Sequence, residues 1–286
     1  MKVNWIFEKY LFEEYENQLV STIKNSGQNC YLLDDSYWDF DFDRSVKEKY
    51  KEEDCVIFYG SLNLGQRLWR ETNFIPGIFL TIENYECYKY YSYYGDKLVN
   101  SEYMLLGIND VKRMNKMFFD KFGSDEMFIR PSNGYKTFTG QLLSKKNFEY
   151  EFDIFMKTYF IEDNQLVLIA PKQNVREENR FIIINENGIN RIVDGNKYMI
   201  DREVLTERIV DEEAWKYCES VINNYTPDKA FTIDIAKMDD GIYKVLEIGS
   251  FCCAGWYNMD LEKVVKEINN LCINEYKDYY GLPINQ

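Results

Sequence analysis

The sequence predicts a mixed fold in which a small α/β domain precedes an α+β domain built from antiparallel hairpins. The first domain is predicted by short apolar stretches that suit buried strands and by a helical apolar stripe between two of them. The second is predicted because its strand candidates are joined by turn residues and followed by helices. We place the boundary so that the domains cover residues 1–110 and 111–286.

The N-terminal domain begins with a predicted strand in VNWIF, residues 3–7. Helical spacing follows and stops at Gly27; it is formed by Leu11, Phe12, Tyr15, Leu19 and Ile23. CYLLDD (30–35) and CVIFYGS (55–61) predict buried strands that run into turns. A small parallel sheet is therefore expected.

Two further stretches of this domain are open to more than one interpretation. GSLNLG, residues 60–65, lacks the lysine of a phosphate-binding P-loop, and we interpret it as a turn at a strand end. YECYKYYSYYG, residues 85–95, suits either a surface that stacks on sugars or bases, or alternating β-structure with packed rings. The strand preference of tyrosine favours β-structure. A helix is predicted over 109–122.

The second domain contains four strand candidates, which are MFIRP (127–131), TGQLL (139–143), QLVLIAP (165–171) and RFIIIN (180–185). The last of them turns at residues 186–188 into INRIV (189–193). A helix is predicted around 211–225. The final helix is predicted from about Met259, and its apolar stripe is Leu261, Val264, Val265, Ile268, Leu271 and Cys272.

The stretch DIAKMDDGIYKVLE, residues 234–247, predicts a hairpin that turns at Asp239-Asp240-Gly241, where Gly241 can take a positive φ. One register places Ile233, Ile235, Leu246 and Ile248 on a single apolar face. The same register sets Asp234 directly opposite Glu247, with their Cβ atoms roughly 5 Å apart. Two opposed acids destabilise a hairpin unless a cation neutralises them.

Composition excludes several function classes. The chain has 34 Lys and Arg against 48 Asp and Glu, a net charge of −14, which argues against broad nucleic-acid or anionic-membrane binding. It has no histidine, so Ser-His-Asp and Cys-His catalysis and histidine-ligated zinc are excluded. No apolar run is long enough to span a membrane, and residues 1–15 carry charges where a signal peptide needs an apolar region. We expect a cytoplasmic protein whose seven cysteines are reduced and mostly buried.

Cations recur near strand ends of the second domain. Arg130 and Lys136 bracket a turn built on Pro131 and Gly134, which suits an anion such as triphosphate; the alternative is a surface hairpin with two solvated charges. Lys172, Glu178 and Arg180 form a weaker second group, which could equally be a solvated loop. Asp234 and Glu247 suit Mg²⁺, which takes one or two carboxylates together with substrate phosphates. Metal, cations and the lack of histidine indicate phosphoryl chemistry.

In order along the chain, FIRP…K.FTG, PK…EENRF and FTIDIA…DGIYKVLEIGSFCCAGWYNMD resemble the ATP-grasp superfamily, and more closely its R2K clade, over roughly residues 55–270. The resemblance implies ATP between two antiparallel-sheet subdomains with packed helices, preceded by a small α/β domain. Many ATP-grasp sequences have Asn two residues after the metal-binding glutamate, whereas this chain has Gly249. Ser250 or water would then replace the Asn, or the second metal would bind weakly.

The resemblance assigns roles by position. It implies that Arg130 and Lys136 face the phosphates, and that Ala170 and Lys172 lie at the linker that contacts adenine. Glu178 matches a nucleotide-contacting acid and Arg180 a catalytic arginine, a role that Arg130 shares. Asp234 and Glu247 match the magnesium-binding acids.

The activity that the resemblance implies is an ATP- and Mg²⁺-dependent ligation of a carboxylate to an amine through an acyl phosphate. The substrates would be small molecules, peptides or proteins. One alternative is an ATP-binding assembly factor or chaperone that ligates nothing. A second alternative is a glycosidase that uses a pair of carboxylates.

Overall fold

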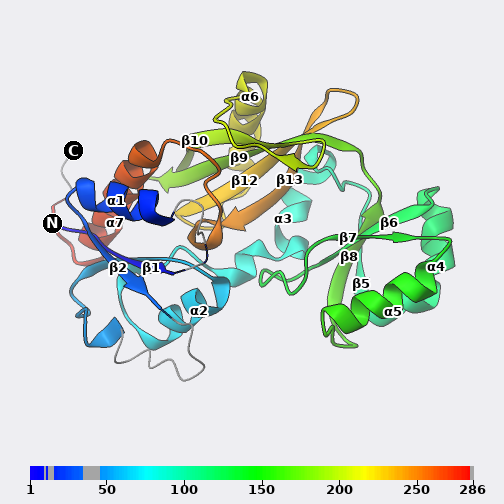
Figure 1. Ribbon diagram of the computed structural model, residues 1–286, viewed down its shortest axis with the longest axis horizontal. Helices are drawn as coiled ribbons and strands as arrows, with labels where there is room; N and C mark the ends of the chain where they lie inside the picture. Colours follow the sequence, from blue (N-terminus) through cyan, green and yellow to red (C-terminus); the bar gives the residue numbers. More distant parts are fainter. Residues whose placement is uncertain (10, 12–15, 35–45, 284–286) are drawn as a thin grey trace. The chain divides into compact units, whose positions relative to one another are not determined.

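The computed structural model describes residues 1–9, 11, 16–34 and 46–283, and it divides into two compact units (Figure 1). The first unit consists of residues 1–80, 179–233 and 248–286, and the second unit of residues 81–178 and 234–247. Each unit is therefore assembled from segments that are distant in the sequence.

The first unit begins with a parallel sheet of four strands in the order β2-β1-β3-β4. Its strands are β1 (Asn4–Glu8), β2 (Asn29–Leu33), β3 (Cys55–Tyr59) and β4 (Ile75–Gly77). Helix α1 (Glu16–Asn25) follows β1, and helix α2 (Leu62–Glu71) follows β3. The predicted small parallel sheet is confirmed; the predicted helix positions Phe12 and Tyr15 lie outside the described residues.

A five-stranded sheet has the order β11-β10-β9-β12-β13. The strands are β9 (Val175–Glu186), β10 (Ile189–Ile200), β11 (Glu203–Val204), β12 (Ala230–Met238) and β13 (Tyr243–Ser250). Helix α6 (Glu212–Val221), the 3-10 turns η4 (Ile222–Asn224) and η5 (Phe251–Cys253), and helix α7 (Leu261–Tyr279) belong to the first unit. The predicted helices near 211–225 and after Met259 are confirmed.

The core of the first unit joins its parallel sheet to α1 and α7. Trp5 and Phe7 of β1, and Val265 and Ile268 of α7, are each fully buried in one apolar cluster. Trp5 Nε1 also donates a hydrogen bond of 2.9 Å to Oδ1 of Asn269. The apolar stripe predicted for the last helix is therefore its core face, and it fixes the parallel sheet.

The second unit contains an antiparallel sheet in the order β5-β8-β6-β7, with α4 and α5 beside it (Figure 1). The strands are β5 (Met104–Gly107), β6 (Glu126–Pro131), β7 (Gln141–Ser144) and β8 (Leu166–Pro171). The helical elements are η2 (Ile82–Tyr85), α3 (Cys87–Tyr94), η3 (Gly95–Lys97), α4 (Ile108–Phe122) and α5 (Phe148–Thr158). Phe119, Phe148 and Phe152 pack from the helices onto Met127 and Ile129 of β6.

Two local predictions are wrong. The tyrosine-rich segment is helix α3 rather than β-structure, because Cys87, Tyr90, Tyr91 and Tyr94 recur at helical spacing and are all buried. GSLNLG is the start of helix α2 rather than a simple turn, since the side chain of Ser61 caps the helix by accepting from the backbone N–H of Leu64 at 3.3 Å.

The cysteines follow the expectation from composition: five are buried, and Cys30 and Cys253 are half-buried. Within the described part of the chain, no helix is both long enough and apolar enough to cross a bilayer.

Candidate functional site

Three of the predicted site residues meet at the carboxylate of Glu247 in the second unit. Nη2 of Arg130, on β6, lies 3.3 Å from Oε2 of Glu247, and Nζ of Lys136 lies 3.0 Å from Oε1. Each carboxylate oxygen therefore faces a different cation. These residues come from segments more than 100 positions apart, and the sequence patterns predicted all three.

Arg130 is held in a buried environment made largely by α3. The residue is only 9% exposed. Burial on its own lowers the pKa of Arg130, but the neighbouring Tyr90 and Cys87 raise it, and the net pKa lies well above its ordinary value. Arg130 also opposes the rise that burial causes in the pKa of Tyr90. Residues of the tyrosine-rich helix thus lie near a permanent positive charge next to Glu247.

Lys136 reaches Glu247 from the loop between β6 and β7. Its φ is 51°, a left-handed backbone conformation that is uncommon for a non-glycine residue. Gly134 packs against the carbonyl oxygen of Ile82 so closely that a Cβ at this position would clash. The glycine therefore allows a close backbone approach that fixes the loop two residues before Lys136.

The hairpin of β12 and β13 turns as predicted at Gly241, whose φ is 85°. At the turn, the N–H of Met238 donates to the carbonyl oxygen of Ile242 at 2.9 Å, a pairing one residue out of step with the predicted register. Farther along, Oγ1 of Thr232 donates to the carbonyl oxygen of Gly249 at 3.2 Å, and this contact agrees with the predicted register. Leu246 packs against Ala236 and Met238, so its predicted place on the face of Ile233 and Ile235 is wrong.

Asp234 lies in β12 and belongs to the second unit together with Glu247. It is 2% exposed. This burial excludes an arrangement in which Asp234 and Glu247 are both exposed and are kept apart by water. The direct opposition of Asp234 and Glu247 remains a prediction. A buried carboxylate and a second carboxylate that is partly open to solvent form a donor set suited to Mg²⁺ that also binds phosphate oxygens.

Among the described residues, no group of three or more acidic, cysteine or histidine side chains is placed to hold a metal ion. An ion here would depend on two carboxylates and on the ligands that a substrate brings. Magnesium fits this requirement, because it keeps waters and commonly binds through one or two carboxylates and substrate phosphates.

Lys172 and Ala170 lie elsewhere in the second unit. Lys172 forms an ion pair with Glu126, at the opposite end of β6 from Arg130. Four residues of extended strand separate Glu126 from Arg130, which corresponds to about 13 Å. Ala170 is fully buried and is paired with Phe128 across β6 and β8. Lys172 therefore lies far from Arg130 along β6, whereas Ala170 is two positions along β8 from Leu168, the residue paired with Arg130.

Glu178 and Arg180 both lie on β9. Glu178 is half-buried and belongs to the second unit, whereas Arg180 belongs to the first. The guanidinium carbon of Arg180 lies 5.4 Å and 5.0 Å from the ring centroids of Tyr198 and Tyr257, within cation–π range. The two rings stack on each other at 4.4 Å. Arg180 is therefore held by aromatic rings in the first unit.

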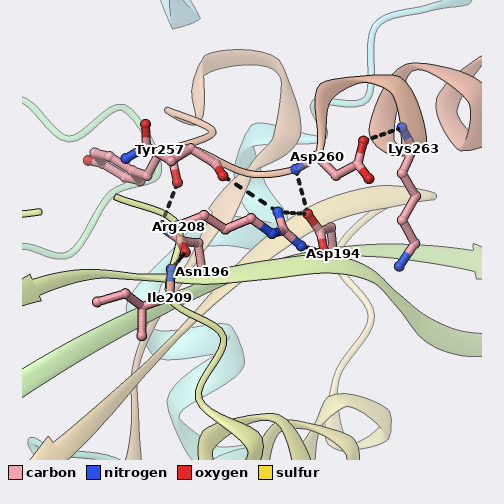
Figure 2. A network of polar contacts seen from close by, with 8 residues as sticks. Asp194, Asn196, Arg208, Ile209, Tyr257, Asp260 and Lys263 are labelled. Atoms are coloured by element: carbon pink, nitrogen blue, oxygen red, sulfur yellow. Dashed lines mark hydrogen bonds and ion pairs between the residues drawn. The ribbon is translucent and has the colours of Figure 1, made fainter. Parts of the chain in front are cut away.

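A polar network that the sequence patterns did not predict fixes the loop that carries Tyr257 (Figure 2). Arg208 donates to both carboxylate oxygens of Asp194, at 2.7 and 2.8 Å, and the backbone N–H of Asp260 donates to the same carboxylate at 2.8 Å. Nδ2 of Asn196 donates to the carbonyl oxygen of Tyr257 at 2.7 Å. The loop is thereby tied to β10.

The pKa of Asp194 reflects this network. The residue is 1% exposed, and burial on its own raises its pKa. The hydrogen bonds from Arg208 and from the backbone of Asp260 and Gly195, together with the charge of Arg208, lower it, and the net pKa lies below its ordinary value. An acid within the apolar stretch INRIVDGN was the only local signal of this network.

The comparisons with solved structures identify the fold. A D-alanine-D-alanine ligase from Coxiella burnetii is similar with a TM-score of 0.65 at 14% sequence identity, over 98% of this chain and 98% of that chain. The D-cycloserine synthetase DcsG is similar with a TM-score of 0.57 at 11% identity, over 94% of this chain and 99% of that chain. The ATP-grasp ligase PsnB, complexed with a phosphomimetic variant of minimal precursor, Mg and ADP, is similar with a TM-score of 0.55 at 13% identity, over 96% and 98% of the two chains. No curated protein sequence matches the chain.

These similarities define an ATP-grasp fold, as the sequence predicted. Residues 110–267, more than half of the chain, match the ATP-grasp domain of R2K clade family 2. The chain therefore belongs to this family.

Proposed function

We propose that the protein is an ATP- and Mg²⁺-dependent ligase that joins a carboxylate to an amine, releasing ADP and phosphate. The observation that carries this proposal is the pairing of Arg130 and Lys136 with the two oxygens of Glu247 in an ATP-grasp chain. The substrates are small molecules or peptide or protein groups, and the reaction takes place in the cytoplasm. We keep the division into a domain of residues 1–110 and an ATP-grasp domain of residues 111–286 as part of this proposal.

In this mechanism the cations beside Glu247 bind and orient the phosphates. Arg130 is buried and always charged, so it supplies a fixed positive potential for the charge that develops on the transferred γ-phosphoryl group. Lys136 is 41% exposed and lies on a loop, so it can move from Glu247 to a phosphate oxygen. Asp234 and Glu247 would hold Mg²⁺, which would neutralise phosphate charge when bound.

The remaining chemistry needs no protein nucleophile. The phosphoryl group forms a bond with a substrate carboxylate, and the bond to ADP breaks. The substrate amine then attacks the acyl phosphate and displaces phosphate. In this proposal Arg180 acts on the reacting groups, while Ala170, Lys172 and Glu178 contact the nucleotide. The chain contributes orientation and charge, which suits a sequence without histidine.

One observation favours the alternative, an ATP-binding assembly factor without ligase activity. Gly249 stands where many ATP-grasp sequences have Asn, and Ser250 is the nearest side chain that could replace it. However, Oγ of Ser250 donates to the carbonyl oxygen of Phe79 at 3.0 Å and accepts from the N–H of Cys252 at 3.2 Å. Ser250 is thus committed to the fold of the first unit. Water would have to complete a second metal site.

Three measurements test this proposal, and the last of them separates the two functions. Mg²⁺-ATP should raise the melting temperature more than metal-free ATP does, because the acids need the ion to accept the triphosphate. Asp234→Asn should keep the fold and remove most of this difference; unchanged affinity for Mg²⁺-ATP would take Asp234 out of the site. Release of ADP that depends on added carboxylate and amine would establish the ligase, whereas nucleotide binding without ADP in every substrate mixture would favour the assembly factor.

A further inference from the structure

A second candidate site lies wholly within the second unit, where the loop after β6 meets the end of α5. It is a pocket of about 790 Å³, and its lining includes Glu86, Ser132, Asn133, Tyr159, Phe160 and Glu162. The volume falls within the range of roughly 300–1,000 Å³ that small-molecule sites occupy. None of the residues predicted to bind nucleotide or metal is among its lining residues.

Two polar atoms on the pocket-lining residues are buried without a partner. Ser132 is 2% exposed, and neither its Oγ nor Oδ1 of Asn133 makes a hydrogen bond with any residue that the structure describes. The backbone of Ser132 is held on both sides, since its N–H donates to Leu166 at 3.1 Å and its carbonyl oxygen accepts from Cys87 at 2.8 Å. Burying such an atom unpaired destabilises the fold. Both atoms are closed off from solvent, so a ligand in the pocket would pair with them once these side chains turn toward it.

Phe160 is a second unusual feature of the same pocket. It is 90% exposed, and its φ is 50°, a strained conformation for a non-glycine residue. The adjacent Tyr159 is fixed, because its hydroxyl accepts from Nε2 of Gln141 at 3.1 Å. An aromatic ring that is both solvated and strained adds nothing to the core, so we interpret Phe160 as a contact for a ligand.

Charge determines which ligand the pocket suits. Two carboxylates, Glu86 and Glu162, are among the lining residues, and none of those residues is a lysine or an arginine. An anion would meet no compensating charge. Oδ1 of Asn133 can only accept a hydrogen bond, so a ligand that pairs with it must carry a donor such as an N–H group. Aromatic faces beside carboxylates favour an organic cation.

We propose that this pocket binds an ammonium or guanidinium group carried on an apolar stem, such as the basic side chain of a peptide. Glu86 and Glu162 supply the charge, and Asn133 and Ser132 accept hydrogen bonds from the cation. Phe160 covers the apolar stem. This assignment does not depend on the proposed ligase activity.

The position of the pocket gives such binding a structural consequence. Tyr135 and Thr137 line it as well, and Lys136 lies between them on the same loop. A ligand that orders Tyr135 and Thr137 would also restrict Lys136, whose Nζ lies at Glu247.

The test uses the full chain and isothermal titration with three compounds. Argininamide and citrullinamide are both used with an acetylated α-amine, so that the guanidinium is the only charge of the first and the second is its neutral isostere. Acetyl-Ala-Arg-Ala-amide presents the same side chain within a peptide. We expect citrullinamide to bind at least about tenfold more weakly than argininamide, since loss of a charged hydrogen-bonded contact costs roughly 1.5–3 kcal/mol. Tighter binding of the tripeptide than of argininamide would indicate that the cation belongs to a peptide. Equal binding of the two would indicate a small organic cation.

Substitutions in the pocket test whether argininamide binds there. Ser132→Ala should weaken argininamide binding without lowering the free energy of unfolding, because it removes a hydroxyl that has no partner in the described structure. Glu162→Gln and Phe160→Ala should also weaken it. Asp163→Asn, at the neighbouring exposed acid, and Tyr150→Ala, at an aromatic residue of α5 that is 72% exposed, are the matched controls.

Three results would overturn the proposal. One is the lack of saturable binding of both arginine compounds at millimolar concentration. Another is equal affinity for citrullinamide. The third is argininamide affinity that stays unchanged in all three pocket variants.

Discussion

At the scale of single residues, Glu247 is the most informative side chain of the chain. Its two oxygens each face one cation, a buried arginine and a more exposed lysine. The two cations differ in burial: Arg130 is buried near Tyr90 and Cys87 of α3, whereas Lys136 projects from a loop. Replacing either of them should therefore have a different effect.

Lys136→Met should weaken Mg²⁺-ATP binding by about tenfold or more, because it removes a charge that would bind phosphate. Its effect on the free energy of unfolding should stay below about 1 kcal/mol, since the pair with Glu247 is partly exposed. Titration of nucleotide and chemical denaturation measure the two quantities. Lys145→Met is the control, because Lys145 makes a comparable exposed ion pair with Asp120 at 2.7 Å. Equal losses of affinity in both variants would contradict the assignment.

The sequence predicted the residues around Glu247 better than it predicted their surroundings. Arg130 and Lys136 stood out because they bracket a turn, and Glu247 stood out because the predicted hairpin register sets it opposite Asp234. Asp194 and Arg208 did not stand out, because they interact across 14 positions with no turn or motif linking them. A contact of this kind depends on the tertiary fold, so the local spacing of residues does not predict it.

At the scale of secondary-structure elements, α3 shows how a propensity can mislead. Tyrosine favours strands, but the segment also repeats its buried positions at helical spacing. In a strand, Tyr88 and Tyr90 would share one face. In the helix, Tyr90 is fully buried and Tyr88 is 50% exposed. The need to bury several rings and cover Arg130 outweighs the intrinsic preference for β-structure.

This difference gives a direct test of the element. Tyr90→Ala should lower the free energy of unfolding by about 3–5 kcal/mol, as loss of a large buried aromatic ring does. Tyr88→Ala should change it by less than about 0.5 kcal/mol, because the ring is exposed. Urea denaturation of both variants measures this contrast. Comparable losses would indicate a strand-like arrangement in which both rings are buried.

The loop between β13 and α7 depends on Asp194. Asp194→Asn should lower the free energy of unfolding by about 2–3 kcal/mol at neutral pH, because it weakens hydrogen bonds to a charged partner. The pKa of Asp194 is lowered in the folded protein, so this contribution is present above the ordinary carboxyl pKa and is lost as pH falls through the folded value. Denaturation at several acidic pH values should show the variant and the parent protein converging. A constant difference down to pH 2 would contradict this.

At the scale of the whole molecule, buried thiols should make the fold sensitive to alkali. Burial raises the pKa of Cys30 from 9.0 to about 11, with a smaller contribution from Glu16 opposed by Lys24. Between these two values the unfolded chain ionises this thiol and the folded chain does not, so the free energy of unfolding falls as pH rises. Cys30→Ala should reduce the slope of stability against pH across this window. An unchanged slope in denaturation experiments between pH 9 and 11 would contradict the assignment.

The overall architecture was predictable in part. The parallel sheet, the antiparallel hairpins and the final helix follow from patterns that extend over several residues, and the family resemblance supplied their arrangement. Such patterns could not predict which residues make up each compact unit. Residues 234–247, for example, join the unit that contains 81–178 rather than the one containing their flanking residues. The strands β12 and β13 each have residues in both units, so a single boundary in the sequence cannot describe the two compact units.

The pairing at Glu247 has a consequence for the order in which ligands arrive. In the proposed site, a divalent ion that arrives alone would have to displace Arg130 or Lys136 from a carboxylate oxygen of Glu247. A nucleotide that carries its own ion would give Lys136 phosphate oxygens to bind and would free one oxygen of Glu247 in the same exchange. We therefore expect the ion to bind together with the triphosphate rather than before it.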